Sequence, residues 1–212
     1  MSDLLPNGKV LEIGYGIGLG TYYLSQNHDV LSLDNNQYFI NKATQYLNVK
    51  KCKYTIHKCD ILNMTSSDLQ IIQEFKPEII VAWFIGSAGE DVNTHIYEKT
   101  NLAEKVKLYR ERIEDLIVSK DIVTNSVKTI NFALRGMTHA NISDEVMYID
   151  QKQNYDTYVF HNTGFEVTDV KSIKWDIDKS GFRYSTAHNP HFSKVKEVIP
   201  VVISIIAEKS YS

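Results

Sequence analysis

The sequence is poor in the features that mark secreted, metal-binding and membrane proteins. It has two cysteines, Cys52 and Cys59, and their spacing resembles no zinc-binding pattern. Its apolar stretches, such as 79–85 and 199–207, are far shorter than the roughly 20 residues that cross a bilayer. No secretory signal segment is recognisable. We therefore expect a cytoplasmic protein with reduced cysteines, no metal site and no membrane segment.

The sequence also lacks a strong charge of either sign. Its 23 Lys and Arg residues nearly balance 26 Asp and Glu residues, which gives a formal net charge of −3. Without a broad basic field there is little to neutralise phosphates, so a nucleic-acid partner is not expected. The length of 212 residues suits one domain over residues 1–212, because it allows a full α/β core.

Short β-branched runs alternate with amphipathic segments along the chain, the pattern of a mostly parallel sheet with helices on both faces. A cap at Ser66 or Ser67 is expected for the third helix, and one at Ser143 or Asp144 for the last helix. The strands are predicted at Lys9–Ile13, Asp29–Leu33, Lys53–His57, Ile79–Phe84, Val127–Leu134, Phe165–Trp175 and Val198–Lys209. The helices are predicted at Gly20–Asn27, Gln37–Leu47, Ser66–Phe75, Asn101–Ser119 and Asp144–His161.

The most informative segment is the glycine-rich run that follows the first predicted strand, Val10–Thr21. Glycine allows positive φ and lets a ligand approach the backbone closely. A dinucleotide fingerprint needs the spacing Gly-x-Gly-x-x-Gly, but Leu19 and Thr21 stand where the third glycine is required. The pattern is instead acid-x-Gly-x-Gly-x-Gly, which suits an adenosine-type ligand without a pyrophosphate.

This pattern resembles the first motif of the class I S-adenosylmethionine-dependent methyltransferases. The resemblance extends to the Gly164-Phe165 junction before the sixth strand and to the order of the elements. It implies a Rossmann-like, seven-stranded, mostly parallel sheet whose last strand is antiparallel. It also implies S-adenosyl-L-methionine as the cofactor. The residues that it places at the cofactor are Glu12, Gly14, Tyr15, Gly16, Gly18, Asp34, Asn35, Asp60, Ile61 and Trp83.

Three of these positions have expected roles and also simpler explanations. Asp34 ends the second strand, where a carboxylate can accept the ribose hydroxyls, although a turn or helix cap needs the same residue type. Asp60 ends the third strand, where the family places a carboxylate toward the adenine amino group with Ile61 against the ring; turn chemistry is the alternative. Trp83 either lies along the cofactor and stacks on an acceptor or fills the core.

The fourth strand is followed by residues that depart from the nucleic-acid enzymes of this family. Those enzymes carry an Asn or Asp-Pro-Pro-aromatic quartet or a Pro-Cys pair there, whereas this chain reads Trp83-Phe84-Ile85-Gly86. We therefore predict direct SN2 methyl transfer to a small-molecule acceptor. Two alternatives stay open: another use of the same cofactor, by aminocarboxypropyl transfer or cyclisation, and a non-catalytic cofactor-binding module.

The catalytic half of the site is much less clear from the sequence than the cofactor half. His139 and Tyr158 are candidate general bases by position only, and a surface histidine is the simpler reading of His139. Residues 135–139 are expected as a loop that reaches the rim of the site. A connection of about twenty residues, 176–196, is expected to be either a substrate lid or an exposed hairpin extension.

Overall fold

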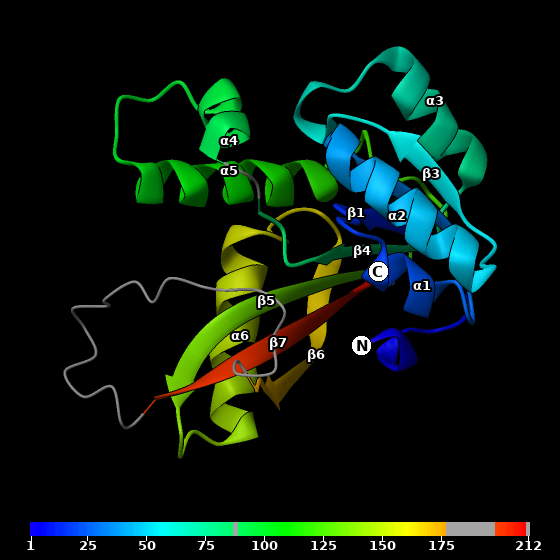
Figure 1. Ribbon diagram of the computed structural model, residues 1–212. Coiled ribbons are helices and arrows are strands. Elements are labelled where there is room, and N and C mark those ends of the chain that lie inside the picture. The colour runs from blue at the N-terminus through cyan, green and yellow to red at the C-terminus, as the bar shows by residue number, and fades with distance from the viewer. Residues whose placement is uncertain (87–88, 177–197, 211–212) are drawn as a thin grey trace.

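A computed structural model describes residues 1–86, 89–176 and 198–210 of the chain. The described residues form one seven-stranded sheet with helices against it (Figure 1). The strands are β1 (Lys9–Ile13), β2 (Asp29–Asp34), β3 (Thr55–Lys58), β4 (Ile79–Trp83), β5 (Thr129–His139), β6 (Phe165–Lys174) and β7 (Val198–Lys209). The α-helices are α1 (Leu19–Leu24), α2 (Gln37–Lys50), α3 (Ser66–Phe75), α4 (Gly89–His95), α5 (Leu102–Ile117) and α6 (Asp144–Tyr158).

The strand order is β3-β2-β1-β4-β5-β7-β6. The first five strands of that order pair in parallel, and β7 is antiparallel to both of its neighbours, β5 and β6. This arrangement confirms the predicted fold class. Because β1, β2, β3 and β4 run in one direction, the residues that follow them meet at one edge of the sheet, the usual ligand edge of open α/β sheets.

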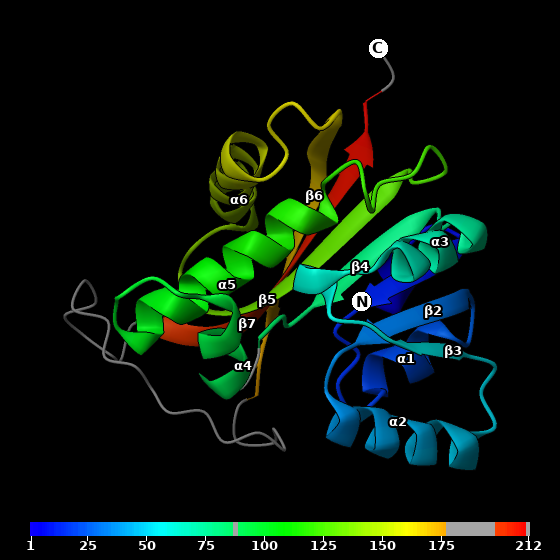
Figure 2. The same cartoon turned by 90° about the horizontal axis from the view of Figure 1, so that it is seen from above.

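Helices cover both faces of the sheet, as Figure 2 shows: α1 and α2 lie on one side, and α3, α5 and α6 on the other. The central strands carry apolar side chains in succession because both of their faces are covered; Val10, Leu11 and Ile80 are fully buried. Helix α5 buries Tyr109, Ile113 and Ile117, which lie at helical spacing on one face.

Two local predictions were wrong, and one helix was not predicted. Residues 135–139 are not a rim loop, because they continue β5 and pair with β7 as far as His139 and Val198. Helix α3 is capped by Thr65 rather than by Ser66 or Ser67, since Thr65 and Asp68 form a reciprocal capping box. Helix α4 was not predicted. The cap of α6 was predicted at Ser143 or Asp144, and it is Ser143, whose side chain accepts the Val146 amide.

Two further expectations concern membrane-spanning helices and the lid. Among the described residues, no helix is both long enough and apolar enough to pass through a bilayer. The expected lid, 176–196, falls outside the described residues except for Asp176.

Candidate functional site

The glycine-rich loop follows β1 at the edge where the parallel strands end. The Gly14 amide donates to the Leu33 carbonyl of β2 at 2.8 Å, which fixes the start of the loop. Gly14, Gly16 and Gly18 have φ values of +74°, +53° and +84°. A Cβ atom on Gly14 or Gly16 would meet nothing within 4 Å, whereas one on Gly18 would lie 3.0 Å from the Ala43 Cβ. The first two glycines therefore present bare backbone to open space, and the third allows close packing on α2.

The side chain of Glu12, the acid that begins the motif, is buried in the interior and does not lie on the open side of the loop. Its buried carboxylate accepts hydrogen bonds from the hydroxyls of Thr21 at 2.6 Å and Ser32 at 2.7 Å. Its other oxygen lies where a Cβ on Gly20 would come within 2.4 Å of it. Burial raises the pKa of Glu12 to about 7, against the opposing effect of the two hydroxyls. Glu12 thus ties β1 to α1 and β2.

Tyr15 lies between the first two glycines of the loop, and its side chain is buried with Ala43 and Leu47 of α2. Its hydroxyl has no hydrogen-bond partner among the described residues. Burial raises the pKa of this phenol well above its usual value. The ring therefore fastens the loop to α2 while the backbone on either side stays open.

Asp34 stands beside the loop at the end of β2. One carboxylate oxygen accepts the Gly16 amide at 3.0 Å, and the other accepts the Asn36 amide at 2.9 Å. Burial raises the pKa of Asp34, and the bonds from these amides oppose that rise. Asp34 therefore holds the open part of the loop at a set distance from the end of β2. Carboxylate oxygens have further lone pairs, so the same group can also accept ligand hydroxyls.

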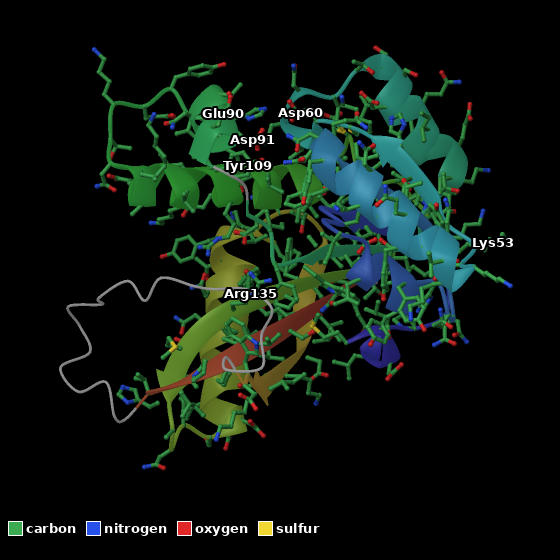
Figure 3. All side chains as sticks on the ribbon, viewed as in Figure 1. Lys53, Asp60, Glu90, Asp91, Tyr109 and Arg135 are labelled. Atoms are coloured by element: carbon green, nitrogen blue, oxygen red, sulfur yellow. The ribbon has the colours of Figure 1, made fainter. Side chains whose placement is uncertain are left out.

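A polar network joins the ends of β2 and β3 to α4 and α5. The side-chain amide of Asn35 donates to one Asp91 carboxylate oxygen at 3.0 Å, and the Tyr109 hydroxyl donates to the other at 2.6 Å. His95 contacts the Asp60 carboxylate at 2.9 Å through Nε2 and the Asp91 carbonyl at 2.9 Å through Nδ1. Figure 3 shows Asp60, Asp91 and Tyr109 gathered where α4 and α5 face the end of β3.

Sequence reasoning named Asn35 and Asp60 but missed their partners in this network. The signal for α4 was present: Glu90 and Asp91 suit a first helical turn, and His95 follows Asp91 by four positions, one turn later on the same face. The partnership itself joins segments far apart in the chain, so it shows only in the fold.

No protein-family model matches the sequence, and no curated protein matches it. Solved structures with a similar fold do exist. One is described provisionally as a sarcosine dimethylglycine methyltransferase from Galdieria sulphuraria (TM-score 0.54, 11% identity, covering 98% of this chain and 80% of that one). Another is a ribosomal protein L11 methylase from Lactobacillus delbrueckii subsp. bulgaricus (TM-score 0.51, 12% identity, covering 98% of this chain and 72% of that one). The chain has a class I methyltransferase-like fold. At such low identity the likeness concerns the fold alone.

Within this methyltransferase-like fold, Trp83 and Ile61 are half-buried and pack against the core with part of their side chains. The Trp83 indole donates to the Asn131 side chain at 2.6 Å and packs with the buried cluster around Val10 and Leu24. Ile61 lies in the short 3-10 helix Ile61–Asn63 and packs against the main core. Trp83 therefore has the contacts expected of its core-filling alternative.

The two candidate bases lie away from the glycine loop of the methyltransferase-like fold. His139 is the last residue of β5, about 20 Å along that strand from Ala133, the partner of Trp83. Tyr158 ends α6 with 76% of its surface exposed, near the start of β6 and so at the opposite edge of the sheet. The structure does not bring either side chain to the loop.

A hollow of about 530 Å³ lies at that opposite edge, where β4, β5 and β6 begin. Its lining includes Glu78, Lys128 and Glu166, and Glu78 pairs with Lys128 at 3.2 Å. It is separate from the glycine loop, which lies where β1 ends. We therefore base the candidate site on the loop edge of the methyltransferase-like fold.

Replacing His95 by asparagine is expected to lower the free energy of unfolding by about 2 kcal/mol, because Asp60 and Asp91 lose the half-buried imidazole that bonds to both. Burial alone lowers the pKa of His95, but its bonds with Asp91 and Asp60 raise it overall. This stabilisation is complete below the unfolded-state pKa and is lost as pH rises through the folded-state pKa. Urea unfolding at pH 6 and pH 9 should therefore show a smaller difference at pH 9, with the exposed His161→Asn as control.

Proposed function

We propose that this chain is an S-adenosyl-L-methionine-dependent methyltransferase. The observation that carries the proposal is the open, positive-φ backbone of Gly14 and Gly16 beside the Asp34 carboxylate, in a fold shared with methyltransferases. Side-chain-free backbone next to a carboxylate suits a ligand that combines an amino-acid part with a ribose. The residues present therefore fit this cofactor.

The proposed division of roles follows the positions of the side chains. The backbone at Gly14 and Gly16 would lie along the amino-acid part of the cofactor, and Asp34 would accept the ribose hydroxyls. Asp60 and Ile61, at the end of β3, would face the adenine. Glu12, Tyr15 and Gly18 would act on the cofactor indirectly, since their contacts shape the loop from behind.

The cofactor supplies a methyl group already activated by its sulfonium. The acceptor's nucleophilic atom would displace the sulfur directly, so the chain's contribution is to hold both molecules in line. Orientation of this kind accounts for up to about 7–11 kcal/mol of a barrier in favourable systems. Because His139 and Tyr158 lie far from the loop, the proposed mechanism does not route a proton through either of them.

We propose a small molecule as the acceptor and a cytoplasmic location. The segment after β4 lacks the Pro-Pro-aromatic and Pro-Cys motifs that hold nucleic-acid bases, and the chain has no excess of positive charge. The solved structures of similar fold carry names that refer to both a small-molecule and a protein acceptor, so the fold does not favour one acceptor class.

Replacing Asp34 by alanine is expected to weaken binding of S-adenosyl-L-methionine by about 10- to 100-fold, because hydrogen bonds to a charged group are lost. Calorimetry on the purified protein measures this effect. Asp29→Ala is the matched control, since Asp29 lies at the other end of the same strand. Equal affinities of the Asp34 and Asp29 variants would count against the proposed site.

The reaction is tested with labelled cofactor and a cell extract. S-adenosylhomocysteine as product supports methyl transfer, whereas methylthioadenosine would favour aminocarboxypropyl transfer. Label recovered in RNA or protein would contradict the small-molecule acceptor. If the cofactor does not bind at all and Asp34→Ala leaves stability unchanged, a non-catalytic module that has kept only the fold becomes the better explanation.

A further inference from the structure

Helix α4 is joined by side-chain contacts to the ends of two neighbouring strands, β2 and β3. Asp91, in the first turn of α4, accepts the side-chain amide of Asn35, which follows β2. His95 lies one turn later on the same face of α4 and contacts the carboxylate of Asp60, just after β3. Figure 3 shows Asp60 and Asp91 on facing elements at this edge. α4 therefore borders the strand ends that flank the proposed cofactor site.

Asp60 is tied to the neighbourhood of the proposed ribose site and stays accessible. The amide of the preceding residue, Cys59, donates to the Asp34 carbonyl at 3.0 Å, so the end of β3 is fixed to the end of β2. One Asp60 oxygen accepts the Leu62 amide at 3.2 Å, and the other faces Nε2 of His95 at 2.9 Å. The Asp60 side chain is 33% exposed, and each carboxylate oxygen has more than one lone pair. Asp60 can therefore accept a further donor from a ligand.

The His95 ring is held in one orientation, with Nε2 toward Asp60. Nδ1 lies 2.9 Å from the Asp91 carbonyl oxygen. A carbonyl oxygen only accepts, so Nδ1 donates this bond, and the ring cannot turn over without losing it. The ring also meets that of Tyr109 edge-on, with centroids 5.8 Å apart, and the Arg112 guanidinium donates to the His95 carbonyl at 2.8 Å. These contacts fix both the backbone and the side chain of His95.

We propose that His95 is a positioning residue, which holds the Asp60 carboxylate where it accepts the exocyclic amino group of the cofactor's adenine. The protonated imidazole donates from Nδ1 to the helix and from Nε2 to Asp60, and a charge-assisted bond of this kind is strong. A binding group that is already held in place loses little freedom when the ligand arrives. This inference rests on the proposed function, since it concerns the same cofactor site.

The proposed role makes the choice of base depend on His95. Hypoxanthine carries an oxygen in place of the amino group of adenine, and that oxygen has no proton to donate to Asp60. A carboxylate that is held in place therefore favours adenine over hypoxanthine. A purely structural role of His95 in α4 would instead change the affinities for both bases alike.

The test is calorimetry at pH 6, where a histidine with a raised pKa is protonated. The probes are S-adenosyl-L-homocysteine and S-inosyl-L-homocysteine, which differ only in carrying adenine or hypoxanthine. We expect the wild type to bind the adenosyl compound at least about tenfold more tightly, because hydrogen bonds to charged groups have effects of this size. The inosyl compound should bind the wild type and the His95 variants equally.

Two substitutions of His95 separate the two ring nitrogens. His95→Asn keeps a donor near the position of Nδ1 but has no group at that of Nε2, so the preference for adenine should fall to about threefold or less. His95→Gln places an uncharged donor near Nε2 and should keep part of the preference, because its bond to a carboxylate is weaker than that of an imidazolium. His161→Asn, at an exposed histidine beyond α6, is the matched control.

A double variant tests whether His95 acts through Asp60. Asp60→Ala removes the acceptor, so the preference for adenine should be lost. Adding His95→Asn to Asp60→Ala should then lower the preference no further, since residues that act as one unit are not additive. A further loss in the double variant would mean that His95 acts without Asp60, and would overturn the inference.

Other outcomes would also contradict it. An unchanged preference in His95→Asn, or equal loss of affinity for the two probes, assigns His95 to the stability of α4 alone. Melting curves establish that each variant is folded; if His95→Asn is not, His95→Gln decides, and an unchanged preference in it counts against the inference. A wild type that binds both probes equally contradicts this inference alone. A wild type that binds neither contradicts the proposed function, and this inference with it.

Discussion

Replacing Gly18 by alanine is expected to lower the free energy of unfolding by about 3 kcal/mol. Gly18 has a φ of +84°, which costs an alanine about 1–2 kcal/mol. The added Cβ would also lie 3.0 Å from the Cβ and 3.2 Å from the Cα of Ala43, and 3.3 Å from a methyl carbon of Leu47. Both neighbours are fully buried in α2, so neither can move away cheaply.

Urea unfolding followed by circular dichroism measures this loss, and the loop supplies its own control. Gly14→Ala meets the same conformational penalty, with a φ of +74°, but its Cβ would meet nothing within 4 Å. We therefore expect about 1–2 kcal/mol for Gly14→Ala, from conformation alone. Similar losses for the two variants would show that packing of Gly18 on α2 adds nothing to stability.

The fold was predictable wherever it depends on short stretches of sequence. The all-apolar run 79–83 indicates a central strand because only burial on both faces tolerates it. The spacing of Gly14, Gly16 and Gly18 after a strand predicts the turn, and the positive φ of all three agrees. Asp34 at the end of β2 lies beside that turn, as its position in the sequence suggested.

The parts that could not be predicted depend on partners far along the chain. Residues 135–139 become strand because β7 pairs with them, and their own residues show no clear alternation. The bond between Asn35 and Asp91 spans 56 positions, and that between Asp60 and His95 spans 35. No local pattern encodes such contacts, so the sequence alone could not predict the partners of Asp60 and Asn35.

The structure also adds to the roles expected of the motif acids. Glu12 was expected at the cofactor, yet both hydroxyls that it binds belong to the interior, on α1 and β2. Asp34 was expected to contact the ligand, and it also stabilises the conformation of the loop by accepting a hydrogen bond from the Gly16 amide. A motif therefore combines residues that would touch the ligand with residues that shape the backbone around it, and periodicity does not separate the two.

Glu12→Gln is expected to make the folded chain more stable than the wild type above pH 7 by up to about 3 kcal/mol. Burial raises the pKa of Glu12 from 4.5 to about 7, and each pKa unit corresponds to about 1.4 kcal/mol. Between pH 4.5 and about pH 7, the folded state therefore still holds a proton that the unfolded state has lost. In that window the wild type loses stability as pH rises, and above it the loss is complete.

Glutamine keeps a carbonyl oxygen for the Thr21 and Ser32 hydroxyls and carries no charge at any pH, so Glu12→Gln should lack this loss. Urea unfolding of both proteins from pH 4.5 to pH 8.5 measures the difference, in which the other titrating groups cancel. Glu208→Gln, exposed on β7, is the matched control. Parallel pH profiles for the wild type and Glu12→Gln would show that Glu12 has the same pKa in the folded and unfolded states. The hydroxyls would then offset the effect of burial, and at neutral pH the loop would rest on a buried anion rather than on a neutral hydrogen-bonded group.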